Sequence, residues 1–123
     1  MTSIRGATTV INDNKEEILL NTKELLQEII KINKIDIEDI ISIFFTATND
    51  ITKEYPAVAA REIGILNASL MCMDELYIEG SLPKCIRVMV NIETNKKQKD
   101  MKHIYLKEAI GLRPDLNNTI KEV

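Results

Sequence analysis

Apolar positions recur at helical spacing along residues 16–33, which is the clearest pattern in the chain. Asn14 precedes this segment and Glu17 stands three residues later, as expected for a helix N-cap and its N3 position. We therefore predict an amphipathic helix that begins after Asn14 and buries one apolar stripe. The stripe consists of Ile18, Leu19, Leu25, Leu26, Ile29 and Ile30.

Three other segments have the composition and spacing of β-strands. Residues 4–10 end in β-branched side chains, and residues 40–47 form a continuous apolar run, which predicts a strand buried on both faces. Residues 85–92 alternate most regularly, so we predict that Arg87 points away from the aliphatic face of this strand. The aliphatic face carries Ile86, Val88, Val90 and Ile92, and the opposite face carries Cys85, Arg87, Met89 and Asn91.

The remaining elements predicted from the pattern are short. Pro56 and Gly64 are placed to begin and end a short helix, and Pro114 is placed to stop the element before it. The others are a helical turn from Asp36, strand-like patches within residues 65–78, a helix over residues 99–109 with His103 on its polar side, and a last strand at residues 110–112.

These elements define a mixed α/β (α+β) chain, with a small mixed sheet of about five strands and two or three helices. We expect one domain over residues 1–116 and a flexible polar C-terminal tail over residues 117–123. One strong amphipathic helix leaves apolar sheet surface that a single chain does not cover. Association into an oligomer is therefore expected.

The composition adds few constraints beyond a single globular domain. A net charge of −3 argues against a nucleic-acid or anionic-membrane partner. No apolar run reaches the ~18–20 residues that a membrane span needs, and no signal-peptide pattern is visible. Cys72 and Cys85 lie in apolar segments and are interpreted as reduced thiols of a cytoplasmic protein. A single histidine, without CxxC or HxxxH spacing, argues against a metal site.

The four arginines carry the main chemical signal. Arg5, Arg87 and Arg113 lie in apolar or strand-like stretches, and Arg61 lies in a short Ala-rich helix. Burying a guanidinium is costly unless an anionic or polar group meets it, and arginine suits planar recognition of carboxylates and phosphates. The set indicates a pocket for a small, multiply charged anion. For any one arginine, a structural ion pair or an interface role is equally compatible.

Other candidate groups are few, and each has a structural alternative. Glu75, in a mostly apolar segment, accepts from a substrate hydroxyl or forms a plain salt bridge. Cys72 is a pocket residue or a small buried hydrophobe. Tyr105 is a carboxylate donor or a core aromatic. No serine or cysteine nucleophile has a histidine at a recognisable spacing. If the protein is an enzyme, donors positioned around an anion fit better than acid–base or covalent chemistry.

Six motifs, taken in order, resemble the monofunctional chorismate mutases of the trimeric, barrel-like α/β class. They are IRGATTV at 4–10, AREIG at 60–64, CMDEL at 72–76, KCIRVMV at 84–90, HIYLKEA at 103–109 and LRPDL at 112–116. The resemblance implies a trimeric pseudo-α/β-barrel that rearranges chorismate to prephenate, a unimolecular reaction without proton transfer, cofactor or metal. Chorismate carries two carboxylates, a hydroxyl and an enolpyruvyl ether, which an arginine-rich pocket complements.

The resemblance also implies roles for individual residues. Arg87 would donate to the ether oxygen, Glu75 would accept from the ring hydroxyl with Cys72 against the same group, and Arg5 and Tyr105 would hold a carboxylate. The family places its sites at subunit interfaces, so a neighbouring chain is expected to supply part of the pocket. The implied catalytic residues are Arg87, Glu75, Arg5 and Cys72; the implied binding set adds Met71, Met73, Asp74, Tyr105, Tyr55, Arg61, Leu112 and Arg113.

The chain departs from the family pattern at the rim of this implied pocket. Val58 stands where a lysine occurs, Tyr55 where phenylalanine is common and Met71 where threonine occurs, and the stretch from 64 to 70 is one residue shorter. Two other functions are compatible with an arginine-held carboxylate. One is a trimeric imine/enamine deaminase, which would not need Glu75 or Arg5. The other is a sensor that binds chorismate or prephenate without turnover.

Overall fold

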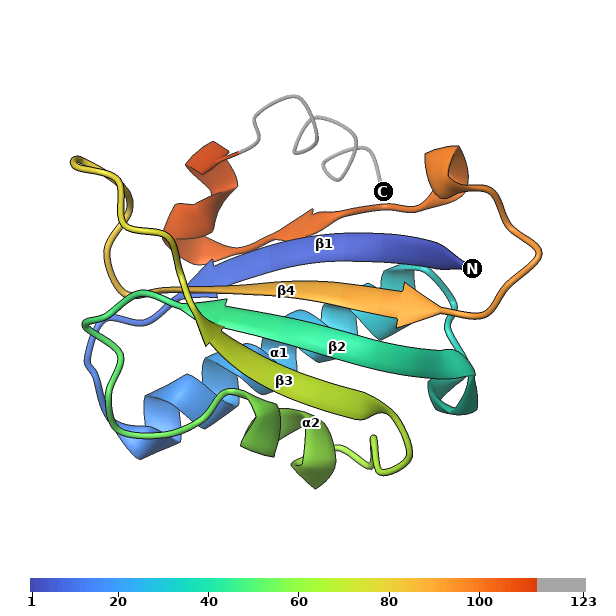
Figure 1. Cartoon of the computed structure of the whole chain (residues 1–123), viewed down its shortest axis with the longest axis horizontal. Coiled ribbons are helices and arrows are strands. Elements are labelled where there is room, and N and C mark those ends of the chain that lie inside the picture. The colour runs from blue at the N-terminus through green and yellow to red at the C-terminus, as the bar shows by residue number, and fades with distance from the viewer. Residues whose placement is uncertain (113–123) are drawn as a thin grey trace.

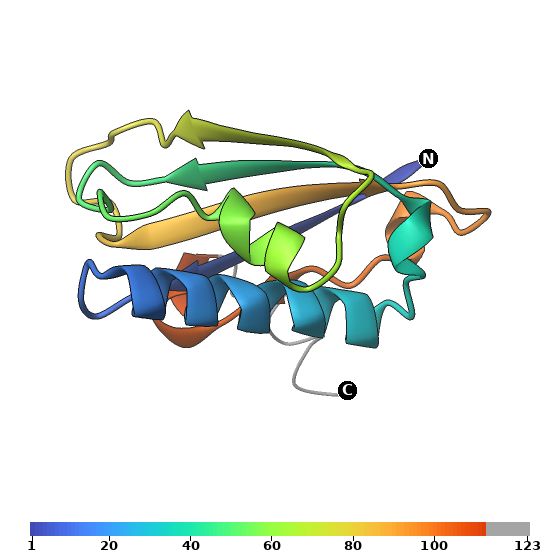
Figure 2. The same cartoon turned by 90° about the horizontal axis from the view of Figure 1, so that it is seen from below.

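The computed structural model describes residues 1–112, and it consists of one five-stranded mixed sheet with its two α-helices on the same face (Figures 1 and 2). Arg113, Pro114 and the predicted tail at 117–123 lie outside the described residues. The strands are β1 (Thr2–Thr9), β2 (Ile40–Ala47), β3 (Ser69–Asp74), β4 (Cys85–Ile92) and β5 (Ile104–Tyr105). The α-helices are α1 (Lys15–Ile32) and α2 (Ala57–Glu62), and the 3₁₀ turns are η1 (Ile37–Asp39), η2 (Gln98–Asp100) and η3 (Lys107–Leu112).

The strand order is β3-β2-β4-β1-β5. The central strand β4 is antiparallel to both β1 and β2, whereas β3 is parallel to β2 and β5 is parallel to β1. The parallel β2–β3 pair needs a crossover, and α2 lies within that connection. The predicted mixed sheet is therefore confirmed.

The helix α1 begins where the sequence predicts. The Asn14 side chain accepts the Glu17 backbone N–H at 2.8 Å, which satisfies one of the free N–H groups of the first turn. The Glu17 carboxylate does not return to Asn14; it accepts the backbone N–H groups of Ile11 and Asn12 and ties the preceding loop to the helix. The predicted apolar stripe is buried except for Ile30, which is half-buried.

The core lies between the sheet and the two helices. Leu25 and Ile29 of α1 pack against Ile4, Phe45 and Val90, which line the helix-facing side of the sheet. Each such side chain contributes about 1.5–3 kcal/mol by leaving water. Among the described residues, no helix is long and apolar enough to cross a membrane.

The C-terminal elements differ from the prediction. The expected helix over residues 99–109 is wrong, because this segment forms η2, an extended stretch ending in β5, and the start of η3. Ile104 and Tyr105 are consecutive and both buried, which suits an edge strand enclosed on two sides but not one stripe of a helix. The expected strand at 110–112 is also wrong, since these residues belong to η3.

Two other predictions concern the strand at 40–47 and the segment 65–78. Residues 40–47 do form β2, but the strand is not buried on both faces, because Phe44 is exposed on the side away from the helices. Within 65–78, only residues 69–74 pair as a strand. The short helix between Pro56 and Gly64 is confirmed: Pro56 immediately precedes α2, and Gly64 follows it with φ of 98°.

Candidate active site

The sheet face opposite the helices collects polar side chains from several strands in one row. The strand registers pair Thr46 of β2 with Arg87 of β4, Arg87 with Ala7 of β1, and Ala7 with Tyr105 of β5. Because paired residues share a face of the sheet, their side chains point to the same side. The neighbouring row contains Phe44, Met89 and Arg5.

These two rows line a cavity of about 350 Å³. Its wall combines the apolar side chains of Phe44, Met73 and Met89 with a small number of polar groups. A mainly apolar cavity with a few convergent polar groups is typical of a small-molecule site. The polar groups are Arg5, Thr46, Glu75, Arg87 and Tyr105.

Glu75 and Arg87 form the charged centre of this cavity. Glu75 Oε2 lies 3.4 Å from Arg87 Nε, and Glu75 Oε1 accepts a hydrogen bond from the Thr46 hydroxyl. The Glu75 backbone N–H donates to the carbonyl of Ala47 at 3.0 Å, so the residue is fixed against β2 just beyond the end of β3. Both carboxylate oxygens thus have a defined neighbour.

The guanidinium of Arg87 is incompletely satisfied within the described part of the chain. Its Nε is buried and meets no hydrogen-bond partner with acceptable geometry, although the Glu75 oxygen is near. The side chain as a whole is 42% exposed, so its accessible surface belongs to atoms other than Nε. A buried donor without a partner is unfavourable. Donors that Arg87 can offer to the cavity are therefore those of the guanidinium other than Nε.

The position of Arg5 depends on a residue that the sequence pattern misassigned. The Arg5 backbone N–H donates to His103 Nδ1 at 2.9 Å. His103 therefore lies in the extended segment before β5 and contacts the site strand, instead of standing on the polar side of a helix. The signal missed was the pairing of residues 104–105 with β1, which is a tertiary contact.

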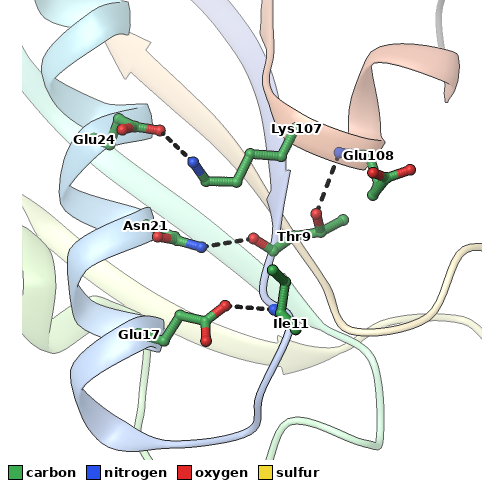
Figure 3. A network of polar contacts seen from close by, with 7 residues as sticks. All are labelled: Thr9, Ile11, Glu17, Asn21, Glu24, Lys107 and Glu108. Carbon is green, nitrogen blue, oxygen red and sulfur yellow. Dashed lines mark hydrogen bonds and ion pairs between the residues drawn. The ribbon is translucent and has the colours of Figure 1, made fainter.

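The turn η3 is fixed beside the cavity by contacts around Thr9 (Figure 3). The Thr9 carbonyl accepts from the Asn21 side chain at 2.8 Å, and its hydroxyl accepts the Glu108 backbone N–H at 3.3 Å. Lys107 Nζ lies 3.1 Å from a Glu24 oxygen, and Lys107 adopts a positive φ of 55°, which a non-glycine residue rarely does. These contacts tie the segment after Tyr105 to α1.

The side chains packed between η3 and the sheet include Cys85, which was not predicted as a site residue. Cys85 is 2% exposed and clusters with Ala7, Tyr105 and Ala109, with Leu112 half-buried against them. Burial raises the pKa of the Cys85 thiol to about 11, and the nearby Arg87 guanidinium offsets part of the rise. The strand alternation had already placed Cys85 on the same face as Arg87, which was the available signal.

The other predicted site residues do not join this cavity in a single chain. Tyr55, Cys72 and Asp74 line a second cavity of about 830 Å³, formed between residues 47–56 and the end of β3, and Met73 lines both cavities. Met71 is exposed on β3, and Arg61 is exposed near the end of α2. Arg113 lies outside the described residues.

Fold and cavity together define an α+β protein whose open sheet face carries a cavity lined by Arg5, Glu75, Arg87 and Tyr105. Comparison with known proteins identifies the class further: the chorismate mutase type I family model matches residues 1–116. The chain belongs to the type I chorismate mutases, which are isomerases.

Individual relatives agree with this assignment. The chain is 44% identical over 117 residues to chorismate mutase AroH of Bacillus subtilis (strain 168), covering 94% of this chain and 92% of the relative. It is 42% identical over 116 residues to chorismate mutase AroH of Thermus thermophilus, covering 94% and 95%. The structure of chorismate mutase from Clostridium thermocellum matches with a TM-score of 0.85 and 48% identity, covering 87% of this chain and 96% of that one. These matches favour the mutase over the deaminase and sensor alternatives.

Proposed function

We propose that the cavity around Arg87 and Glu75 is the centre of the chorismate mutase active site. The enzyme rearranges chorismate to prephenate in phenylalanine and tyrosine biosynthesis. The reaction breaks the ether C–O bond while a C–C bond forms, so negative charge develops on the ether oxygen. The observation that carries the proposal is the Arg87 guanidinium, whose side chain lines the cavity and is 42% exposed, while its buried Nε lies 3.4 Å from the Glu75 carboxylate.

In this proposal, Arg87 donates to the ether oxygen. The strand ladder on both sides of β4 fixes the backbone of Arg87, and the Glu75 carboxylate lies beside its guanidinium, so little reorganisation accompanies the reaction. One such preorganised donor lowers the barrier by roughly 3–4 kcal/mol. Arginine suits this role because its charge is permanent and its donors form a planar fork.

The remaining polar groups would hold the substrate in its reactive conformer. Glu75 accepts from the ring hydroxyl, and Arg5 and Tyr105 bind a carboxylate from β1 and β5. Chorismate reacts only when its enolpyruvyl group lies over the ring, so fixing both ends brings the reacting carbons together. The wall of Phe44 and Met89 would exclude water from the reacting face.

We also propose that the active unit is a homotrimer with its sites between subunits. The apolar side chains partly exposed on the open sheet face include Phe44 at 38%, Met71 at 54%, Met73 at 42% and Met89 at 39%. Contiguous apolar surface of this kind is typical of an interface. A neighbouring subunit would then supply Cys72 and backbone groups of the segment before Glu75, with Tyr55, Arg61, Leu112 and Arg113 at the rim.

We infer a cytoplasmic location from the thiols. Neither cysteine is in a disulfide, and Cys85 is deeply buried. Reduced thiols are the usual state in the cytoplasm. The substrate also belongs to a biosynthetic pathway of small soluble metabolites.

The test is turnover by Arg87→Ala and Arg87→Lys, followed as loss of chorismate absorbance, with prephenate confirmed by acid conversion to phenylpyruvate. Arg87→Ala should lower kcat/KM by at least about 10²–10³-fold, and Lys should recover only part of the loss because a point charge cannot reproduce the fork. Lys31→Ala, an exposed cation at the end of α1, is the control for loss of charge. Near-normal turnover by Arg87→Ala would contradict the assignment.

A further inference from the structure

The carboxylate of Glu75 is held by a residue to which the sequence and the family resemblance give no role. Thr46 lies on β2, lines the cavity and donates its hydroxyl hydrogen to Glu75 Oε1. Its partners in the same row are Met73 on β3 and Arg87 on β4. We infer that Thr46 is a positioning residue, which orients the Glu75 carboxylate and keeps the Arg87 guanidinium available for substrate. This inference rests on the proposed function of the cavity.

The geometry divides the two Glu75 oxygens between different partners. Oε1 accepts the Thr46 hydroxyl hydrogen, and Oε2 lies 3.4 Å from Arg87 Nε. A free carboxylate next to a guanidinium tends to form a two-pronged pair, which is stronger and occupies two donors. To form such a pair, the Glu75 carboxylate would have to rotate until both oxygens face the guanidinium. The Thr46 hydrogen bond opposes this rotation, because Oε1 would have to leave its donor. The Arg87 donors that such a pair would occupy thus remain accessible from the cavity.

The backbone makes Glu75 dependent on this contact. Glu75 is the first residue after β3, so its side chain is not fixed by strand pairing on both sides. Its backbone N–H is bound to Ala47, the residue after Thr46, so β2 fixes both the backbone and the carboxylate. Threonine suits the position because its branched side chain favours strand conformation while its hydroxyl supplies one donor.

The side chain chemistry allows a matched set of variants. Thr46→Val keeps the shape and removes the donor, whereas Thr46→Ser keeps the donor and removes a methyl group. Thr46→Val should lower kcat/KM by about 10- to 100-fold, as expected for loss of a hydrogen bond to a charged group, with most of the loss in kcat. Thr46→Ser should remain within about threefold of wild type. Thr94→Val is the control: it removes a hydroxyl that accepts the Lys96 backbone N–H beyond the end of β4.

A double-mutant cycle separates positioning from a merely structural role. If Thr46 acts through Glu75, Thr46→Val should change kcat/KM by less than about threefold once Glu75 is already replaced by alanine. Equal losses in both backgrounds would overturn the inference, as would full activity of Thr46→Val in the wild-type background. If Thr46→Val does not fold, Thr46→Ala replaces it in the same cycle.

The cycle also distinguishes failure of this inference from failure of the proposed function. Loss of activity in Glu75→Ala together with full activity in Thr46→Val would remove Thr46 alone. Full activity in Glu75→Ala would remove the proposed site, and with it this inference. Thermal unfolding of each variant, measured at one protein concentration, identifies any loss that is due to unfolding.

Discussion

Replacing Gly6 with alanine tests whether close packing at the edge of the sheet positions the active site. Gly6 lies in β1 next to Arg5 and pairs with Ile104 of β5. A Cβ at this position would lie 2.9 Å from the Ile104 carbonyl oxygen, 2.9 Å from Ile29 Cδ1 and 3.1 Å from Leu25 Cδ1. The two methyl groups can move by rotation of their side chains. The carbonyl oxygen belongs to the backbone, so β5 itself must move.

The size of the effect follows from two opposing contributions. Overpacking a filled core costs about 1–3 kcal/mol. Alanine also restricts the unfolded chain relative to glycine, which stabilises the fold by about 0.4–1 kcal/mol. The net expectation is a loss of roughly 0–2.6 kcal/mol in the free energy of unfolding. Gly111→Ala is the matched control, because no atom of residues 1–112 lies within 4 Å of the Cβ it would add.

The same shift should reach the active site, because β5 is only two residues long and, in the described part of the chain, pairs with β1 alone. Moving Ile104 moves Tyr105, whose hydroxyl is proposed to bind a substrate carboxylate. A displacement of about 1 Å can lower the rate by up to about 100-fold, so kcat/KM should fall well beyond the loss of folded protein. The assays are denaturant unfolding at fixed protein concentration and chorismate turnover. Wild-type stability and turnover in Gly6→Ala would refute the reasoning.

Two further predictions concern pH and assembly. The folded pKa of Cys85, about 11, lies above the ordinary value of 9.0, so the stability from its buried neutral thiol is complete below pH 9 and is lost as pH rises toward 11. Wild type should therefore lose about 2–3 kcal/mol more than Cys85→Ala between pH 8 and 11 in denaturant unfolding; parallel curves would contradict this. Met71→Glu, which places a charge on the open sheet face, should dissociate the proposed trimer in sedimentation experiments, and an unchanged sedimentation coefficient would show that this face is not the interface.

The sequence predicted those elements whose local pattern agrees with their tertiary environment. The helix α1 has a cap, a buried stripe and an exposed face, and the structure confirms its start at Asn14. The strand β4 alternates because one face packs on the helices and the other lines the cavity, so the direction of Arg87 could be predicted from spacing alone. In both elements, the spacing of apolar residues along the sequence identifies the face that is buried in the structure.

The C-terminal segment could not be predicted in this way. Helical spacing links residues 101, 104, 105 and 108. Ile104 and Tyr105 are nevertheless buried because β1 pairs with them, and η3 packs against Tyr105. That pairing depends on the absence of a side chain at Gly6, about a hundred residues earlier. Thr46 was missed for a related reason. Its proposed role depends on its contact with Glu75, which lies far from it in the sequence and is brought beside it by the pairing of β2 with β3.

The helix-facing core also determines the chemistry on the opposite face, because strand register links the two. A slip of β4 by one residue would turn Arg87 toward the helices and Val88 toward the cavity. Such a slip would bury an uncompensated cation in the core, which costs several kcal/mol, and expose the apolar side chains of Val88 and Val90. The aliphatic face of β4 therefore selects the register in which Arg87, Thr46 and Tyr105 share one row. Substitutions that enlarge or reduce that aliphatic face should change turnover without touching any polar group in the cavity.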